Sequence, residues 1–181
     1  ENFFIMLSTY ISIKGYDLLI NIGKILKTKK INFLIKIYGY GKNHEYKNLK
    51  NKINNNNLHD IIKLNPFTTE AIFELKKSLG LICLSQSQEA FGLTLIEAMS
   101  QGVPILTTNV GGLKEVFNDS NAGYIYDKND VNGFVDGILE LSKDKIKRQY
   151  FEKNARDHYL KHFNSVKMSK KYYEIINQTN Q

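Results

Sequence analysis

Residues 80–106 read GLICLSQSQEAFGLTLIEAMSQGVPIL. The segment begins with an apolar run, passes through a polar loop, continues with apolar residues at helical spacing between 95 and 99, and ends in a second apolar run at 103–106. Short apolar runs bounded by Gly, Ser or Pro predict strands, and Gly102 follows the end of the helix predicted between them. A strand, a helix and a strand in this order indicate a βαβ unit. Strands that are apolar throughout are typical of a parallel sheet covered on both faces.

The same alternation continues on both sides of this segment. Further strands are predicted at 3–7, 33–38, 60–64 and 123–126. Apolar stripes at helical spacing lie within residues 18–26, 46–53, 72–79 and 131–141. We therefore predict a Rossmann-like, doubly wound parallel α/β sheet of about six strands with helices on both faces. Two polar C-terminal helices are predicted at 145–162 and 165–178, with Asn164 and Ser165 as a cap between them.

Composition bounds the class of protein. The chain has 181 residues, 42% hydrophobic and 24% charged, which is ordinary for a globular protein and excludes wholesale disorder. The single cysteine, Cys83, excludes an intramolecular disulfide and favours a cytoplasmic location, and we interpret it as a small buried hydrophobe within a strand. No apolar run approaches the ~20 residues that a membrane span needs. The chain enters a hydrophobic run within two residues of Glu1, so we interpret it as a piece of a longer protein.

The formal net charge of +7 is unevenly distributed. Residues 1–142 contain 15 basic and 14 acidic residues, whereas residues 143–181 contain 10 basic and 4 acidic residues. A nearly neutral sheet segment without alternating basic and aromatic residues argues against nucleic acid as a partner. The basic C-terminal helices are either a solvated face or a surface for an anionic membrane or a lipid-linked acceptor, which would place the protein at the inner face of the membrane.

Two carboxylates eight positions apart, Glu89 and Glu97, are the strongest candidates for chemistry. Ligands of open parallel sheets bind beyond the carboxyl ends of the strands, where Glu89 is predicted to lie in a loop and Glu97 on the following helix. Between them, Phe91, Gly92 and Leu93 supply backbone N–H groups at a helix start, which suits a phosphate. The alternative is a solvated helix face with ordinary acidic residues.

The segment 89–115 resembles the signature of the retaining GT-B glycosyltransferases of family 4, the glycosyl transferases group 1. It contains their E-x7-E motif from Glu89 to Glu97, then a G-x-P element at 102–104 and a GG-x-x-E element at 111–115. Lys14 and Gly15 after the first predicted strand resemble the family's K-G element. The run 39–41, Gly-Tyr-Gly, resembles its G-x-G element. The resemblance covers about residues 2–165.

The resemblance implies that the chain is the C-terminal, donor-binding half of a GT-B fold. Residues 1–163 would form the nucleotide-sugar-binding Rossmann-like domain. Residues 164–181 would form a helix that packs on the missing N-terminal Rossmann-like domain of the same chain. The whole enzyme would be a retaining glycosyltransferase of the hexosyltransferase type, which transfers a sugar from a nucleoside-diphosphate sugar to an acceptor in bacterial surface polysaccharide or lipopolysaccharide biosynthesis. The fragment alone is expected to bind the donor weakly and to be inactive.

Each residue that matches the motif acquires an implied role. Glu89 would contact the donor sugar and Glu97 the ribose hydroxyls. Lys14 would neutralise the departing diphosphate, so that Glu89 and Lys14 are the catalytic candidates. The remaining donor-binding candidates surround the phosphates and the base; they are Thr9, Gly15, Gly39, Tyr40, Gly41, Leu64, Asn65, Phe91, Gly92, Leu93 and Thr94. Among these, Leu64 and Asn65 would lie near the base.

One departure from the family pattern concerns the phosphate clamp. The family's glycine–arginine pair falls on Ser8 and Thr9, so the arginine is absent, and Thr9 can donate a hydrogen bond but brings no charge. Losing one charged contact costs on the order of 1.5–3 kcal/mol. Lys14 itself has the alternative interpretation of a surface lysine.

No metal and no cofactor are expected. His158 and His162 stand four apart on a predicted helix, but no carboxylate or cysteine completes a metal-binding set. The resemblance also implies metal-independent chemistry. Two alternatives to a transferase stay open: a non-catalytic GT-B-like binding module, which the substitution at Thr9 favours, and a related sugar-nucleotide epimerase or phosphorylase.

Overall fold

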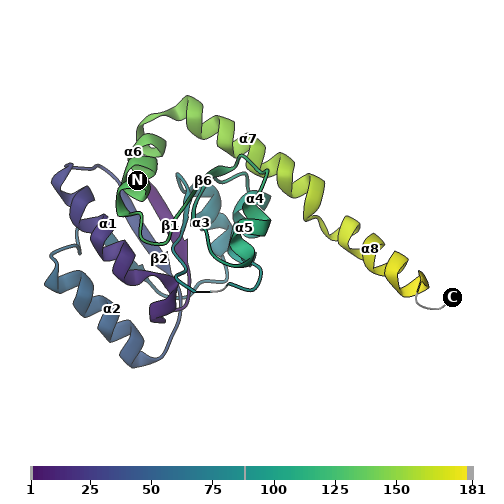
Figure 1. Cartoon of the computed structure of the whole chain (residues 1–181). Coiled ribbons are helices and arrows are strands. Elements are labelled where there is room, and N and C mark those ends of the chain that lie inside the picture. Colours follow the sequence, from purple (N-terminus) through teal and green to yellow (C-terminus); the bar gives the residue numbers. More distant parts are fainter. Residues whose placement is uncertain (1, 88, 179–181) are drawn as a thin grey trace.

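The computed structural model describes residues 2–87 and 89–178. Its centre is a six-stranded sheet whose neighbouring strands all pair in parallel, in the order β3-β2-β1-β4-β5-β6 (Figure 1). The strands are β1 (Phe3–Leu7), β2 (Leu34–Tyr38), β3 (Ile62–Asn65), β4 (Leu81–Cys83), β5 (Ile105–Thr108) and β6 (Gly123–Tyr126). The predicted doubly wound parallel sheet is therefore confirmed.

Helices cover both faces of the sheet. They are α1 (Tyr16–Thr28), α2 (Asn43–Asn55), α3 (Ala71–Lys77), α4 (Leu93–Ser100), α5 (Gly112–Phe117), α6 (Val131–Lys143), α7 (Lys145–His162) and α8 (Ser165–Gln178), with a short 3-10 turn η1 (Ser12–Lys14) after β1. Figure 1 shows α1, α2 and α6 on one side of the sheet and α3, α4 and α5 on the other. The GT-B half that the sequence predicts has this two-faced arrangement.

Two separate hydrophobic clusters explain why the central strand is apolar throughout. Successive side chains of a strand point to opposite faces. Accordingly, Phe4 and Met6 of β1 pack into the cluster that α1, α2 and α6 cover. Phe3 and Ile5 pack into the cluster that α3, α4 and α5 cover. Burial on both faces removes the polar alternation that a half-exposed strand would show.

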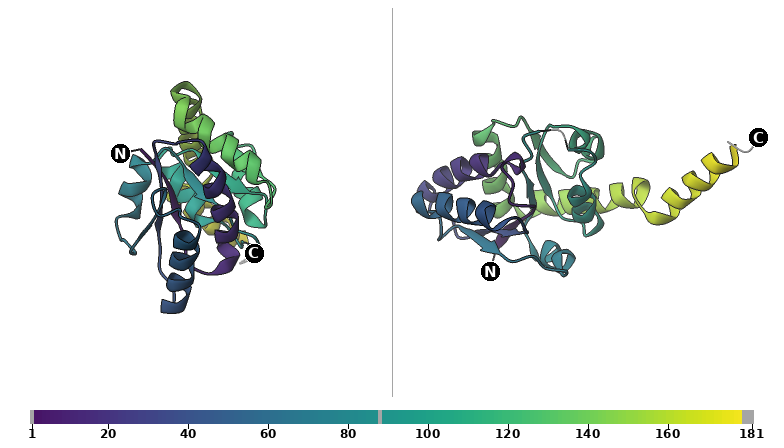
Figure 2. Two further views of the ribbon diagram at one scale, coloured as in Figure 1. Left: turned by 90° about the vertical axis from the view of Figure 1, so that its left-hand side faces the viewer. Right: turned by 90° about the horizontal axis from the view of Figure 1, so that it is seen from below.

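Helix α7 belongs to both clusters. Its Phe151 packs into the first cluster and its Ala155 into the second, and α7 contacts both α4 and α6. Helix α8 begins three positions after α7 ends, with the Asn164 side chain accepting a hydrogen bond from the Lys167 N–H at 3.0 Å, which confirms the predicted cap. Within the described residues, α8 buries no side chain, and it extends away from the body in Figures 1 and 2.

The boundary predicted at residue 163 falls between α7 and α8, and a packing partner for α8 stays a prediction. No helix in the described part of the chain combines the length and the apolar character that crossing a membrane requires.

Some boundaries differ from those predicted. The strand predicted at 60–64 begins at Ile62, because the Ile61 and Ile62 N–H groups both bond to the Leu58 carbonyl in a turn. The strand predicted at 103–106 shifts to Ile105–Thr108. Helix α5 was not predicted, because it is only six residues long and begins with a glycine pair that signals a loop.

The strand order reverses between β1 and β4. From β1 the chain winds outward through β2 to β3, then returns to β4 and winds outward in the other direction to β6. The loops that follow β1 and β4 therefore leave the sheet in opposite directions. In open α/β sheets, the crevice at such a switch point is where ligands bind.

Candidate functional site

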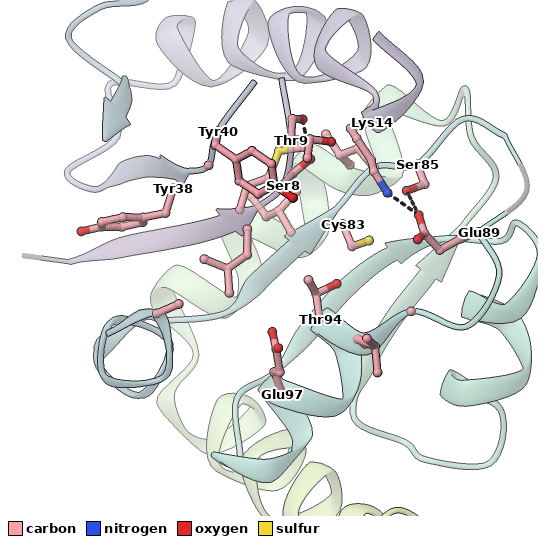
Figure 3. A pocket seen from close by; sticks show the side chains of 18 of the residues that line it. Ser8, Thr9, Lys14, Tyr38, Tyr40, Cys83, Ser85, Glu89, Thr94 and Glu97 are labelled. Atoms are coloured by element: carbon pink, nitrogen blue, oxygen red, sulfur yellow. Dashed lines mark hydrogen bonds and ion pairs between the residues drawn. The ribbon is translucent and has the colours of Figure 1, made fainter. Parts of the chain in front are cut away.

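A cavity of about 550 Å³ opens at this switch point (Figure 3). This volume is in the range of small-molecule binding sites. Its walls come from the ends of β1, β2 and β4, the loops that follow β1 to β4, and the first turns of α3 and α4. Figure 3 shows Lys14, Ser85 and Glu89 at one end, Tyr38 and Tyr40 at the other, and Thr94 and Glu97 between them.

The turn after β1 is held against the end of β4. Gly15 has φ +82°, and a Cβ at this position would lie 1.9 Å from the Leu84 carbonyl oxygen. The Gln86 N–H donates to the Ile13 carbonyl at 2.8 Å across the same junction. Only glycine tolerates both the backbone angle and the close approach. Gly15 thereby fixes Lys14 beside the loop that carries Glu89.

Lys14 and Glu89 form an ion pair in the cavity. The Lys14 Nζ lies 2.6 Å from Glu89 Oε2, and the Ser85 hydroxyl donates to the same oxygen at 2.9 Å (Figure 3). Burial by itself raises the pKa of Glu89. The hydrogen bonds from Lys14 and Ser85 and the charge of Lys14 outweigh that effect, so the pKa lies below its usual value. Glu89 is therefore held as a carboxylate beside a cation.

The backbone of the Glu89 loop rests on the glycine pair that begins α5. The Gly112 N–H donates to the Glu89 carbonyl at 2.7 Å. A Cβ on Gly112 would lie 2.5 Å from the Ala90 carbonyl oxygen and 3.0 Å from the Phe91 Cα. The GG element thus has a structural reason here, since it allows the Glu89 loop to pack directly on the start of α5.

Replacing Gly112 by alanine is expected to push the Glu89 loop out of place. Overpacking of this kind costs about 1–3 kcal/mol, which urea denaturation will measure, and sugar-nucleotide binding should fall with it. The matched control is Gly23→Ala, another buried glycine, whose Cβ would have the flexible ends of the Leu58 and Ile62 side chains as its nearest neighbours, at 3.0 and 3.1 Å, so a smaller loss of stability and no loss of binding are expected. If Gly112→Ala bound ligand as the parent does, Gly112 would have no part in positioning Glu89.

The start of α4 offers free N–H groups to a ligand. Its N-cap is Gly92, with φ +85°, and no side chain of the described residues caps the helix. Gly92, Leu93 and Thr94 all line the cavity. An uncapped helix N-terminus carries partial positive charge and favours an anion such as phosphate.

Two more polar groups, on Thr9 and Glu97, belong to the lining of the cavity. The Thr9 hydroxyl oxygen is buried in the cavity wall and has no hydrogen-bond partner among the residues described. Glu97 lies one turn into α4, and its partial burial raises the pKa of its carboxyl group. Of the described lining residues, Lys14 alone carries a positive charge. A phosphate here would therefore meet one cation, a helix terminus and a neutral hydroxyl.

The opposite end of the cavity is aromatic. The rings of Tyr40 and Phe67 meet edge to face, with centroids 5.8 Å apart, although 63% of Tyr40 and 61% of Phe67 remain exposed. Tyr38, at the end of β2, also lines this end and donates its hydroxyl hydrogen to Glu74 Oε2 at 2.9 Å. Exposed rings beside a cavity can stack on a flat ligand group.

Most predicted site residues line the cavity, and four do not. Thr9, Lys14, Gly39, Tyr40, Glu89, Phe91, Gly92, Leu93, Thr94 and Glu97 line it. Gly15 is buried against the Leu84 backbone, and Gly41 is exposed beside Glu45 and Tyr10. Leu64 and Asn65 belong to β3 rather than to the loop after it, and the Asn65 carbonyl accepts a hydrogen bond from the Tyr10 hydroxyl at 3.0 Å.

Several lining residues were not predicted. Phe67 and Thr68, beyond Pro66, reach the cavity where Leu64 and Asn65 were expected. Ser85 also lines the cavity. It follows a strand that ends at the switch point, and this position could have identified Ser85 as a candidate from the sequence. Cys83, interpreted as a buried hydrophobe, is only partly buried and lines the cavity.

The His158 and His162 rings lie 4.6 Å apart on α7. The described residues hold no group of three or more His, Cys, Asp or Glu side chains that could bind a metal ion.

Comparison with known proteins gives a consistent result. Residues 1–158 match the family described as glycosyl transferases group 1. An uncharacterized glycosyltransferase of Methanocaldococcus jannaschii is 29% identical over 156 residues, which is 86% of this chain and 42% of that protein.

Two solved structures share the fold. A mutant of S. aureus TarM, in complex with fondaparinux, alpha-GlcNAc-glycerol and UDP, has a TM-score of 0.88 and 24% identity, covering 98% of this chain and 36% of that one. HepE of Anabaena, in complex with UDP-glucose, has a TM-score of 0.87 and 20% identity, covering 98% and 49%. The chain spans less than half the length of each of these proteins.

Proposed function

The chain belongs to the glycosyl transferases group 1 family, and from that premise we propose that it forms the donor-binding half of a retaining glycosyltransferase. The whole protein would transfer a sugar, of the hexosyl type, from a nucleoside-diphosphate sugar to an acceptor. The observation that carries this proposal is the convergence of Lys14, Glu89, Glu97 and the uncapped start of α4 on one cavity.

The cavity offers a chemically suitable group for each part of such a donor. The diphosphate suits the start of α4, and the same cavity is lined by Lys14 and by the Thr9 hydroxyl, which bonds to none of the described residues. The sugar suits the Glu89 end. The ribose suits Glu97, and the base suits the aromatic end at Tyr40 and Phe67. A carboxylate accepts hydrogen bonds from hydroxyl groups, which is the chemistry that sugars and ribose present.

Bond cleavage would develop negative charge on the departing diphosphate. Lys14 and the α4 N-terminus would stabilise that charge in the transition state, so the proposed reaction needs no metal ion. Lys14 must exchange its bond to Glu89 for one to the diphosphate. This exchange would leave the Glu89 carboxylate free to accept from the sugar.

The acceptor would be bound elsewhere, on a Rossmann-like domain outside this chain. We propose surface polysaccharide or lipopolysaccharide assembly as the setting, with the protein in the cytoplasm. The excess of basic residues after 142 suits an anionic membrane surface or a lipid-linked acceptor. Nucleic acid is not part of the proposal.

Isothermal titration calorimetry of the 181-residue chain tests this function. UDP, GDP and ADP are titrated in turn, each alone and as its sugar conjugate. We expect weak binding of one base, with the sugar conjugate binding more tightly than the diphosphate, and no sugar transfer by this chain alone. A folded sample that binds none of these ligands would refute the proposed function.

A further inference from the structure

Ser85 is a buried residue of the cavity wall that the proposed donor contacts leave without a role. It lies just beyond the end of β4, and only 3% of its surface is exposed. Its hydroxyl donates to Glu89 Oε2, the oxygen that Lys14 also binds. Both hydrogen bonds that the described residues donate to the Glu89 carboxylate end on Oε2. Oε1 is therefore the oxygen left to accept from a ligand.

We propose that Ser85 is a positioning residue, which holds Glu89 Oε2 so that Oε1 faces the donor sugar, and which keeps this orientation when Lys14 leaves for the diphosphate. This inference rests on the proposed function. A lysine that neutralises the diphosphate cannot at the same time keep its full bond to Glu89. The Ser85 hydroxyl carries no charge and has no such competing demand, so its bond to Glu89 can persist in the donor complex.

The position of Ser85 is itself fixed by the sheet. The Thr108 hydroxyl donates to the Ser85 carbonyl at 2.7 Å, and Thr108 is fully buried at the end of β5. A chain of two hydrogen bonds therefore runs from β5 through Ser85 to Glu89. The contacts that hold the Glu89 loop involve its backbone and do not orient the carboxylate. The two hydrogen bonds do, because they connect the carboxylate to a rigid strand.

A double-mutant cycle tests the inference in the 181-residue chain. Calorimetry gives the affinities of the parent, Ser85→Ala, Glu89→Ala and the double variant for whichever of UDP, GDP and ADP binds the parent, and for the glucose conjugate of that diphosphate. We expect Ser85→Ala to lower the ratio of sugar-conjugate affinity to diphosphate affinity about 10-fold, because a misplaced Glu89 Oε1 loses its hydrogen bond to the sugar, and a hydrogen bond to a charged group is worth about that much. The ratio should not change further when Ser85→Ala is added to Glu89→Ala. Ser87→Ala, an exposed serine of the same loop, is the matched control.

A second measurement does not depend on the ligand. Carbon-detected NMR of the side-chain carboxyl groups gives the pKa of Glu89 in the ligand-free chain. Loss of a donor to the carboxylate should raise this pKa in Ser85→Ala, whereas Ser87→Ala should leave it unchanged. The backbone bond from Thr108 survives in Ser85→Ala, so the variant should still fold, with its urea midpoint lowered only by the loss of the bond to Glu89.

The outcomes separate the inference from the proposed function. If the parent binds nucleotides but Ser85→Ala leaves both the affinity ratio and the Glu89 pKa unchanged, the inference is overturned and the function stands. An equal effect of Ser85→Ala with and without Glu89 would also overturn it, because Ser85 would then act directly on the ligand. A parent that binds no nucleotide would refute the function and, with it, the inference.

Discussion

Replacing Lys14 by methionine should weaken nucleoside-diphosphate binding by about 100-fold. A charge-assisted hydrogen bond contributes roughly 1.5–3 kcal/mol, and Lys14 is the one cation among the described residues that line the cavity. The change also removes the partner of Glu89, whose carboxylate would then face the diphosphate uncompensated. Both effects act in the same direction, which is why the expected loss lies at the upper end of the range.

Calorimetry with the diphosphate that binds the parent measures this loss. Lys24→Met, on the exposed side of α1, is the matched control and should bind as the parent does. In the whole protein, transfer should fall by a further factor of about 10²–10³, because Lys14 stabilises charge that develops only as the bond breaks. Binding within about twofold of the parent would show that Lys14 is a surface lysine without a role at the phosphates.

Glu89→Gln should have opposite effects on two ligands. It releases Lys14 from the ion pair at 2.6 Å, so the bare diphosphate should bind at least as tightly as it does to the parent. It also replaces a charged acceptor by a weaker one at the sugar, so the sugar conjugate should bind about 10-fold more weakly. Loss of folding would weaken both ligands together, which makes the difference in sign diagnostic.

Transfer by the whole protein distinguishes an enzyme from a binding module. For a transferase, Glu89→Gln should lower the rate by about 10²–10³, as the loss of an electrostatic contact to the reacting group usually does. Asp136→Asn, on the exposed side of α6, serves as the control. An unchanged rate, or a parent protein that binds donor and transfers nothing, would favour a non-catalytic module that keeps the fold.

The fold could be predicted where the burial of a segment is visible in the segment's own sequence. A strand such as β1, covered on both faces, must be apolar at every position, and such a run is visible in the sequence. Helix α5 left no comparable trace, because six residues that begin at Gly112, directly after Gly111, resemble a turn. Its place is decided by packing instead, as Leu113 fills the second cluster.

The candidate site could be predicted where neighbouring residues form a recognisable motif, as Glu89, Glu97 and the glycines around them do. The contacts between residues distant in sequence could not be predicted. Lys14 and Glu89 lie 75 positions apart, and Ser85 and Thr108 lie 23 positions apart. Phe67 gives no local signal at all, because an exposed aromatic residue after a proline is common in loops. The paired residues come into contact only when the strands assemble into the sheet.

Helix α7 also has a consequence for the synthesis of the protein. Because Phe151 completes one hydrophobic cluster and Ala155 the other, neither face of the sheet is fully covered until the ribosome has released most of this chain. Once β6 has been synthesised, the nascent sheet therefore keeps apolar surface open on both sides until α7 follows, at the stage when partly folded chains aggregate. Helix α7, which supplies none of the described lining residues of the cavity, thus determines when both apolar faces of the nascent sheet are covered.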